Sequence, residues 1–121
     1  MSCVQLGDTF YWKEGGHLWV VISNPDTHAG EFVIVNLTKD VFRAGKDCEL
    51  HPADHKWITG STYVSFGDAR KLGVKEEINL TEQISLGTIK RHLPLSAALI
   101  QKIVAAGKKS KAMSEEYKAL L

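Results

Sequence analysis

Short apolar runs separated by turn-forming residues fill the first two thirds of the chain. Asp8–Lys13 is rich in aromatic and β-branched residues, and His17–Ser23 and Glu31–Thr38 are near-continuous runs of Val, Ile and Leu. Cys48–Leu50 and Tyr63–Phe66 are shorter segments of the same kind. Because Gly, Pro, Asn and Asp clusters separate these segments, the pattern predicts five short strands of a small barrel or sandwich.

Polar residues fall at the ends of the predicted strands. His17 opens the second strand after the Gly15-Gly16 turn, and Thr38 closes the third. Side chains at the rim of a small barrel are accessible to a ligand. The connection Asn24–Gly30 is long enough to project from the sheet, and Pro25 cannot continue the strand ladder, so we expect a mobile loop there.

From Leu93 onward the pattern becomes helical. Ser96 is a suitable N-cap, Leu95 and Ile100 have the spacing of a hydrophobic staple, and Gly107 is a suitable residue just beyond the C-terminus. An apolar stripe between these ends predicts a helix over 96–106; it consists of Leu99, Ile100, Ile103 and Val104.

A second short helix is predicted after Ser114, through Tyr117 to Leu120. The expected fold class is therefore mainly β, a small β-barrel with a C-terminal α-helix. The length of 121 residues suits a single domain over 1–121, with a β part over about 4–70 and a helical part over about 95–120.

Charge and cysteine content limit the partners and the cellular compartment that we expect for the protein. The 15 Lys and Arg residues nearly balance the 14 Asp and Glu residues, so a nucleic-acid role needs a local basic patch. Lys90-Arg91-His92 and the cluster around Lys108 supply candidates. Two cysteines are too few for a disulfide scaffold, and no apolar run approaches the ~20 residues of a membrane span. We expect a cytoplasmic protein with free thiols and no membrane partner.

Two of the five histidines are candidates for proton transfer, because imidazole titrates near neutral pH. His17 lies at the predicted rim of the sheet, and His55 lies in a polar excursion between Asp54 and Lys56. The spacing Cys48, His51, His55 also suggests zinc, but Pro52 interrupts any helix that would align the histidines. We therefore expect no metal and no other cofactor.

Polar residues also follow the last predicted strand. Ser65, Asp68 and Arg70 lie at or just beyond its end, where Asp68 and Arg70 are placed to bind each other or a phosphate. The chain has neither a recognisable Ser-His-Asp arrangement nor a glycine-rich phosphate loop.

Taken in order, these segments resemble the PemK/MazF/Kid group of toxin proteins. The resemblance rests on Gly7-Asp8 before a strand, the glycine turn, the runs Leu18–Asn24 and Val33–Thr38, and a closing helix. It implies an SH3-like barrel, a homodimer, metal-independent cleavage of single-stranded RNA, and an antitoxin whose tail occupies the substrate groove.

Residue by residue, the resemblance is closer in fold than in active-site chemistry. Thr38 matches the threonine that ends the third core strand of the family. His17 stands in place of the arginine of the glycine-Arg-Pro signature, and Ser65 stands where many members carry arginine, with Asp68 shifted by about one position.

These substitutions predict a modified catalytic set. RNA cleavage without metal needs a base, an acid and a cationic stabiliser of the phosphorane. We assign the acid and the base to His17 and His55. Arg70 is expected to contact the phosphate, and the other predicted substrate-binding residues are Thr38, Ser65 and Asp68. Trp57 or Trp19 is expected to stack on a nucleobase.

Two other functions stay open at this point. A non-catalytic barrel that binds a peptide or nucleic acid would fit the missing arginines. An assembly protein would use the Pro25–Gly30 loop as its contact.

Overall fold

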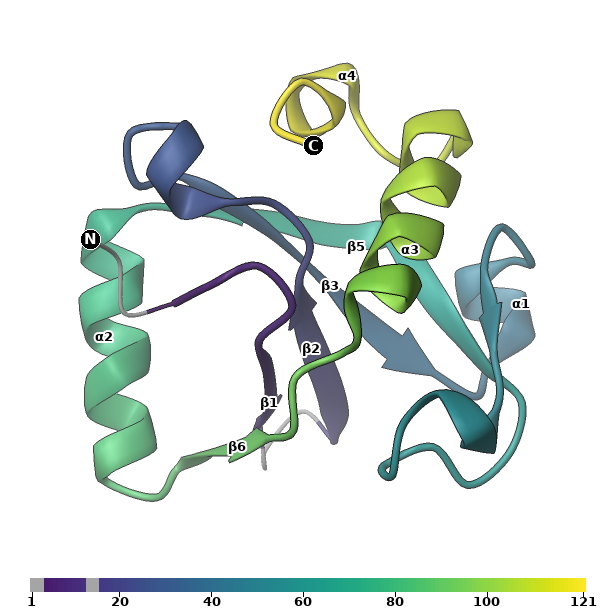
Figure 1. Cartoon of the computed structure of the whole chain (residues 1–121), viewed down its shortest axis with the longest axis horizontal. Helices are drawn as coiled ribbons and strands as arrows, with labels where there is room; N and C mark the ends of the chain where they lie inside the picture. Colours follow the sequence, from purple (N-terminus) through teal and green to yellow (C-terminus); the bar gives the residue numbers. More distant parts are fainter. Residues whose placement is uncertain (1–3, 13–15) are drawn as a thin grey trace.

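The computed structural model describes residues 4–12 and 16–121 and contains a six-stranded antiparallel sheet (Figure 1). The strand order is β4-β5-β3-β2-β1-β6. The strands are β1 (Thr9–Trp12), β2 (His17–Val21), β3 (Phe32–Thr38), β4 (Glu49–Leu50), β5 (Thr62–Leu72) and β6 (Ile89–His92).

All five predicted strands are present, and the mainly β prediction is confirmed. Pairing between β4 and β6, which would close the sheet, is not found among the described residues, so the closed barrel is not confirmed. The thiol of Cys3 and the predicted turn at Gly15 lie outside the described residues.

The structure extends the predicted sheet in two places. β5 has 11 residues rather than four, with a register shift against β3 between Ile34 and Asn36. β6 pairs with β1, which places the Lys90-Arg91-His92 cluster on an edge strand of the sheet.

Two hydrophobic cores cover opposite faces of the sheet. Alternate residues of β2 illustrate the division, because Leu18 and Val20 belong to the first core and Trp19 and Val21 to the second. The first core is completed by α3 (Ala97–Lys109), and the second by Leu80 of α2 (Val74–Ser85). The two helices thus lie on either side of the sheet (Figure 1).

The helix α3 begins as predicted but ends later. The Ser96 hydroxyl accepts a hydrogen bond from the N–H of Leu99 at 3.2 Å. Gly107 lies inside α3 and not beyond its end. A Cβ at this position would lie 3.1 Å from the ring of Phe66. The glycine therefore permits close helix-to-sheet packing rather than a helix stop.

The short helices each have a defined start. α4 (Glu115–Lys118) is capped by Ser114 as predicted, and α1 (Val41–Ala44) is capped by Asp40. The connections include 3₁₀ turns η1 (Pro25–Thr27) and η2 (Pro52–Asp54). In the described part of the chain, no helix has the length and apolar character needed to cross a membrane.

Candidate functional site

The face of the sheet that α2 covers has an apolar part and a polar part. Phe32 and Ile34 of β3 pack in the core beneath α2, and the same alternation brings Asn36 and Thr38 to this face. His17 is two residues from Trp19 on β2, so its side chain lies on the same face of the sheet as the Trp19 ring.

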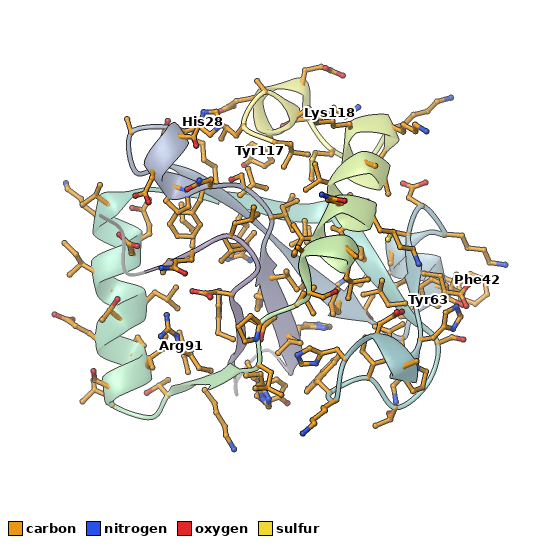
Figure 2. All side chains as sticks on the ribbon, viewed as in Figure 1. His28, Phe42, Tyr63, Arg91, Tyr117 and Lys118 are labelled. Atoms are coloured by element: carbon orange, nitrogen blue, oxygen red, sulfur yellow. The ribbon has the colours of Figure 1, made fainter. Side chains whose placement is uncertain are left out.

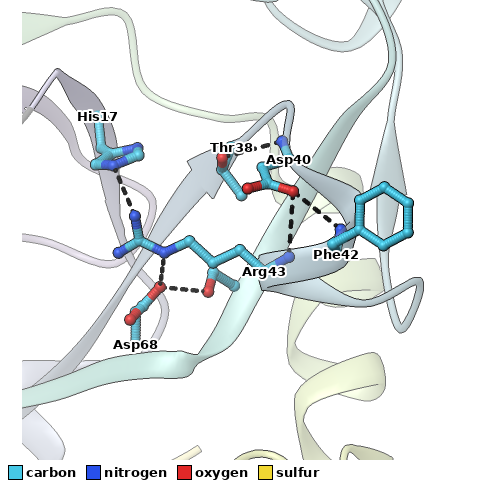
Figure 3. A network of polar contacts seen from close by, with 7 residues as sticks. His17, Thr38, Asp40, Phe42, Arg43 and Asp68 are labelled. Atoms are coloured by element: carbon cyan, nitrogen blue, oxygen red, sulfur yellow. Dashed lines mark hydrogen bonds and ion pairs between the residues drawn. The ribbon is translucent and has the colours of Figure 1, made fainter.

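A guanidinium from outside the sheet joins the polar part of this face. Arg43 Nε donates a hydrogen bond to Asp68 Oδ2 at 3.0 Å, and Arg43 Nη1 donates to His17 Nε2 at 3.3 Å. Ser65 Oγ donates to the same Asp68 oxygen at 2.6 Å. Figure 3 shows the guanidinium between His17 and Asp68. We call His17, Arg43, Ser65 and Asp68 the Arg43 network.

The local sequence fixes the position of Arg43. Asp40 Oδ1 accepts hydrogen bonds from the N–H groups of Phe42 and Arg43, at 3.0 and 3.3 Å. The Asp40 N–H in turn donates to Thr38 Oγ1 at 3.1 Å. Because Thr38 ends β3, this chain of bonds anchors α1 to the strand end.

Hydrogen-bond chemistry assigns the tautomer of His17. A guanidinium donates and never accepts, so Nε2 of His17 presents its lone pair to Arg43. The imidazole is then neutral with its proton on Nδ1. If Arg43 turns to an anionic ligand, the Nε2 lone pair becomes available to accept a proton.

Asp68 is held in its charged form by this network. Burial by itself would raise the pKa of Asp68, but hydrogen bonds from Ser65 and Arg43 and the positive charge of Arg43 together lower it. An ionised Asp68 balances Arg43 and is unsuited to donate a proton.

One buried acceptor in this region has no partner. Asn36 is 1% exposed, and within the described residues its Oδ1 makes no hydrogen bond. Asn36 pairs in register with Ser65, whose hydroxyl is directed to Asp68. An unpaired buried acceptor costs about 1–3 kcal/mol, so Asn36 is a weak point for stability.

His55 is engaged away from the Arg43 network. Its Nε2 lies 2.6 Å from the Leu93 carbonyl oxygen, and its Nδ1 lies 3.0 Å from the Trp57 N–H. A carbonyl only accepts and an N–H only donates, so His55 is neutral with its proton on Nε2. Both nitrogens are used by backbone groups in a residue that is 8% exposed, which indicates a structural role rather than the predicted proton transfer.

Arg70 and the tryptophans also take other positions than those predicted. The Arg70 guanidinium lies over the Trp19 ring, 5.3 Å from its centre, and Trp19 is buried. Trp57 packs against the first core, with its ring centre 6.5 Å from that of Tyr11. The structure therefore brings His17, Ser65 and Asp68 together, and Thr38 is linked to them through Asp40 and Arg43. The other predicted site residues, His55, Arg70 and Trp57, lie outside this group.

The residues with zinc-like spacing do not converge in the described part of the chain. No group of three or more His, Cys, Asp and Glu side chains there is arranged to hold a metal ion. Cys48 is buried, and this burial raises the pKa of its thiol. Its chemistry is that of a core residue.

Arg43 is the residue that sequence reasoning missed. It lies on a four-residue helix, too short to show a periodic pattern. The available signal is local, because Asp40 directly follows a strand and is a typical N-cap residue, which places Arg43 on the first turn of a helix at the rim.

No protein-family model matches this chain, and no curated protein matches it.

Proposed function

We propose that this chain is an endoribonuclease that cleaves single-stranded RNA without a metal ion, as its resemblance to the PemK/MazF/Kid toxins suggests. The observation that supports this most is the position of Arg43. The chain has His17 and Ser65 where the family carries arginines, and Arg43 supplies a guanidinium beside His17 and on the carboxylate that Ser65 binds.

In the proposed reaction, Arg43 binds the scissile phosphate and His17 acts on the neighbouring ribose. His17 Nε2 removes the proton from the 2′-hydroxyl, and the 2′-oxygen attacks phosphorus. Arg43 stabilises the negative charge of the phosphorane. The bond to the 5′-oxygen breaks, that oxygen takes a proton from solvent, and a 2′,3′-cyclic phosphate remains.

In this proposal Asp68 binds Arg43 until the substrate phosphate replaces it. Its carboxylate occupies Arg43 in the free protein, and a phosphate competes for the same guanidinium. Arg43 and Asp68 side chains are 46% and 32% exposed, so water already reaches the pair and substrate can displace Asp68.

The resemblance also supplies the proposed fold family and partners. We propose an SH3-like arrangement for β1 to β5, in agreement with their antiparallel order and the closing helix α3. A homodimer, an antitoxin that covers the RNA site, and a cytoplasmic setting belong to the same proposal.

A second function is favoured by one specific observation. The Arg43 network contains a single imidazole, and its carboxylate is ionised, so it lacks the acid and base pair that two histidines would have formed. A non-catalytic module that binds single-stranded nucleic acid through Arg43 is the alternative.

Incubation of the purified protein with a mixed single-stranded RNA pool in EDTA tests the proposal. We expect cleavage that leaves cyclic phosphate ends. Arg43→Ala should slow cleavage about 10²- to 10³-fold and His17→Ala about 10²- to 10⁴-fold. Lys71→Ala is the matched control, because Lys71 is a partly exposed cation on β5 that pairs with Glu31 and Glu116 and lies outside the Arg43 network.

The outcomes separate the two functions. Binding without cleavage by the wild-type protein would favour the module. Cleavage that survives both Arg43→Ala and His17→Ala would refute the assigned residues, and absence of both binding and cleavage would refute both functions.

A further inference from the structure

The side chain of Phe42 is almost wholly in water. It is 99% exposed, whereas the next most exposed large hydrophobic side chain in the described residues, Leu86, is 76% exposed. A single exposed hydrophobic side chain is ordinary on a protein surface. Its position relative to the Arg43 network makes this one informative.

The backbone of Phe42 is fixed beside Arg43 by hydrogen bonds at both ends of α1. The carboxylate of Asp40 caps both N–H groups, and the N–H of Gly45 donates to the Val41 carbonyl at 2.8 Å at the other end of α1. Ala44 anchors this turn by its burial. The backbone thus directs the guanidinium to His17 and the Phe42 ring away from it into solvent (Figure 3).

The surroundings of the ring suit a single nucleic-acid strand better than an apolar partner. Tyr63, opposite Thr38 in the sheet register, lies at the same edge of the molecule as Phe42 (Figure 2). Lys39 and Lys46 precede and follow α1 and both are exposed, and the Lys39 ammonium donates a hydrogen bond to the Thr59 hydroxyl. The nearby carboxylates are engaged, since Asp40 caps α1, Asp68 binds Arg43, and Asp47 accepts a hydrogen bond from Ser110.

We propose that Phe42 stacks on an unpaired nucleobase of the same strand whose phosphate is bound at Arg43. This inference rests on the proposed function only for the phosphate at Arg43, and not on cleavage. Every base presents an aromatic face, so an exposed ring and a cation on the same helical turn bind a single strand with little sequence preference. The pre-ordered turn lowers the entropy lost on binding.

Binding of short labelled single-stranded DNA tests this inference apart from cleavage, because DNA lacks the 2′-hydroxyl that the reaction requires. Fluorescence anisotropy at one fixed salt concentration compares oligodeoxythymidine with an abasic strand of equal length. Phe42→Ala should weaken binding of oligodeoxythymidine about 5- to 100-fold, while Phe42→Trp should retain it. Leu86→Ala is the matched control, since it removes an exposed apolar side chain at the end of α2.

Binding of the abasic strand shows whether any loss of affinity in Phe42→Ala comes from base stacking. If Phe42 stacks on a base, the wild-type protein and Phe42→Ala bind the abasic strand equally. Equal loss for both strands, unchanged binding of oligodeoxythymidine by Phe42→Ala, or no binding of either strand by the wild-type protein would overturn the inference. If the DNA results hold and RNA is not cleaved, the nuclease proposal fails and the stacking role of Phe42 stands.

Discussion

The regions around His17 and His55 use the same side chain in opposite ways. His55 is buried, and both of its ring nitrogens bind backbone groups, the Leu93 carbonyl and the Trp57 N–H. His17 is half-buried, and its Nε2 binds a side chain, the guanidinium of Arg43. Backbone partners are fixed by the fold, whereas a side-chain partner can move when a ligand binds.

This difference indicates what each region contributes. The His55 contacts join the loop after η2 to the segment between β6 and α3, which is 38 residues away in the chain. The His17 region instead contains an exposed ion pair and, within the described residues, a buried acceptor on Asn36 that has no partner. We infer that the His55 region is built for stability and that the His17 region retains polar groups at a cost to stability.

The largest expected effect is on stability at His55. His55→Ala leaves the Leu93 carbonyl and the Trp57 N–H without their partner and opens space in a buried site. We expect a loss of about 2–4 kcal/mol in the free energy of unfolding, measured by urea denaturation.

Two histidine variants control for this result. His17→Ala should change the free energy of unfolding by less than about 1 kcal/mol, because its partner is half-exposed. His51→Ala removes an exposed histidine from the same loop and should behave similarly. Equal effects of His55→Ala and His17→Ala would remove the distinction between the two regions.

We expect substitution of Asn36 to change the free energy of unfolding by a smaller amount and to raise it. Asn36→Val removes the unpaired acceptor and adds a β-branched residue to a buried strand, so the free energy of unfolding should rise by about 1 kcal/mol. Thr38→Val, two residues along the same strand, is the matched control because the Thr38 hydroxyl accepts a hydrogen bond, and it should lower stability. Destabilisation by Asn36→Val would show that its amide is satisfied in solution.

The smallest effect concerns pH. Because the pKa of Asp68 is lowered from 3.8 in the folded protein, its contribution to stability is present above about pH 4 and is lost as the pH falls through the lower folded value. The stability difference between wild type and Asp68→Asn should be under about 1 kcal/mol at neutral pH and shrink in acid. Urea denaturation at several pH values measures it. A difference that stays constant down to about pH 2 would count against the Arg43–Asp68 pair.

The apolar pattern predicted much of the fold. Continuous runs of Val, Ile and Leu identify β2 and β3 because both strands are buried, and Ser96 identifies the start of α3 because a capping hydroxyl is a local signal. α2 was missed because only Leu80 is fully buried in this helix and exposed Val74 and Ile78 interrupt its polar face. Gly107 was misread because its closeness to Phe66 is a tertiary property.

The candidate site was predicted only in part, for a similar reason. His17 and Thr38 stand at strand ends, where their position follows from local sequence. Ser65 and Asp68 lie within β5, which continues to Leu72, and not at the predicted end of that strand. The role of His55 depends on Leu93, 38 residues away in the chain, and no local pattern indicates that contact. Local sequence signals therefore predicted which residues lie at strand ends. Contacts between residues distant in sequence determine which histidine faces the site.

Long-range ¹H–¹⁵N NMR of the histidine rings, with and without single-stranded DNA, tests the central claim most directly. We predict that the free protein has His17 protonated on Nδ1 and His55 on Nε2. On addition of DNA, the His17 Nε2 resonance should shift while His55 remains unchanged. A shift at His55 with none at His17 would contradict the claim that Arg43 and His17 form the nucleic-acid site.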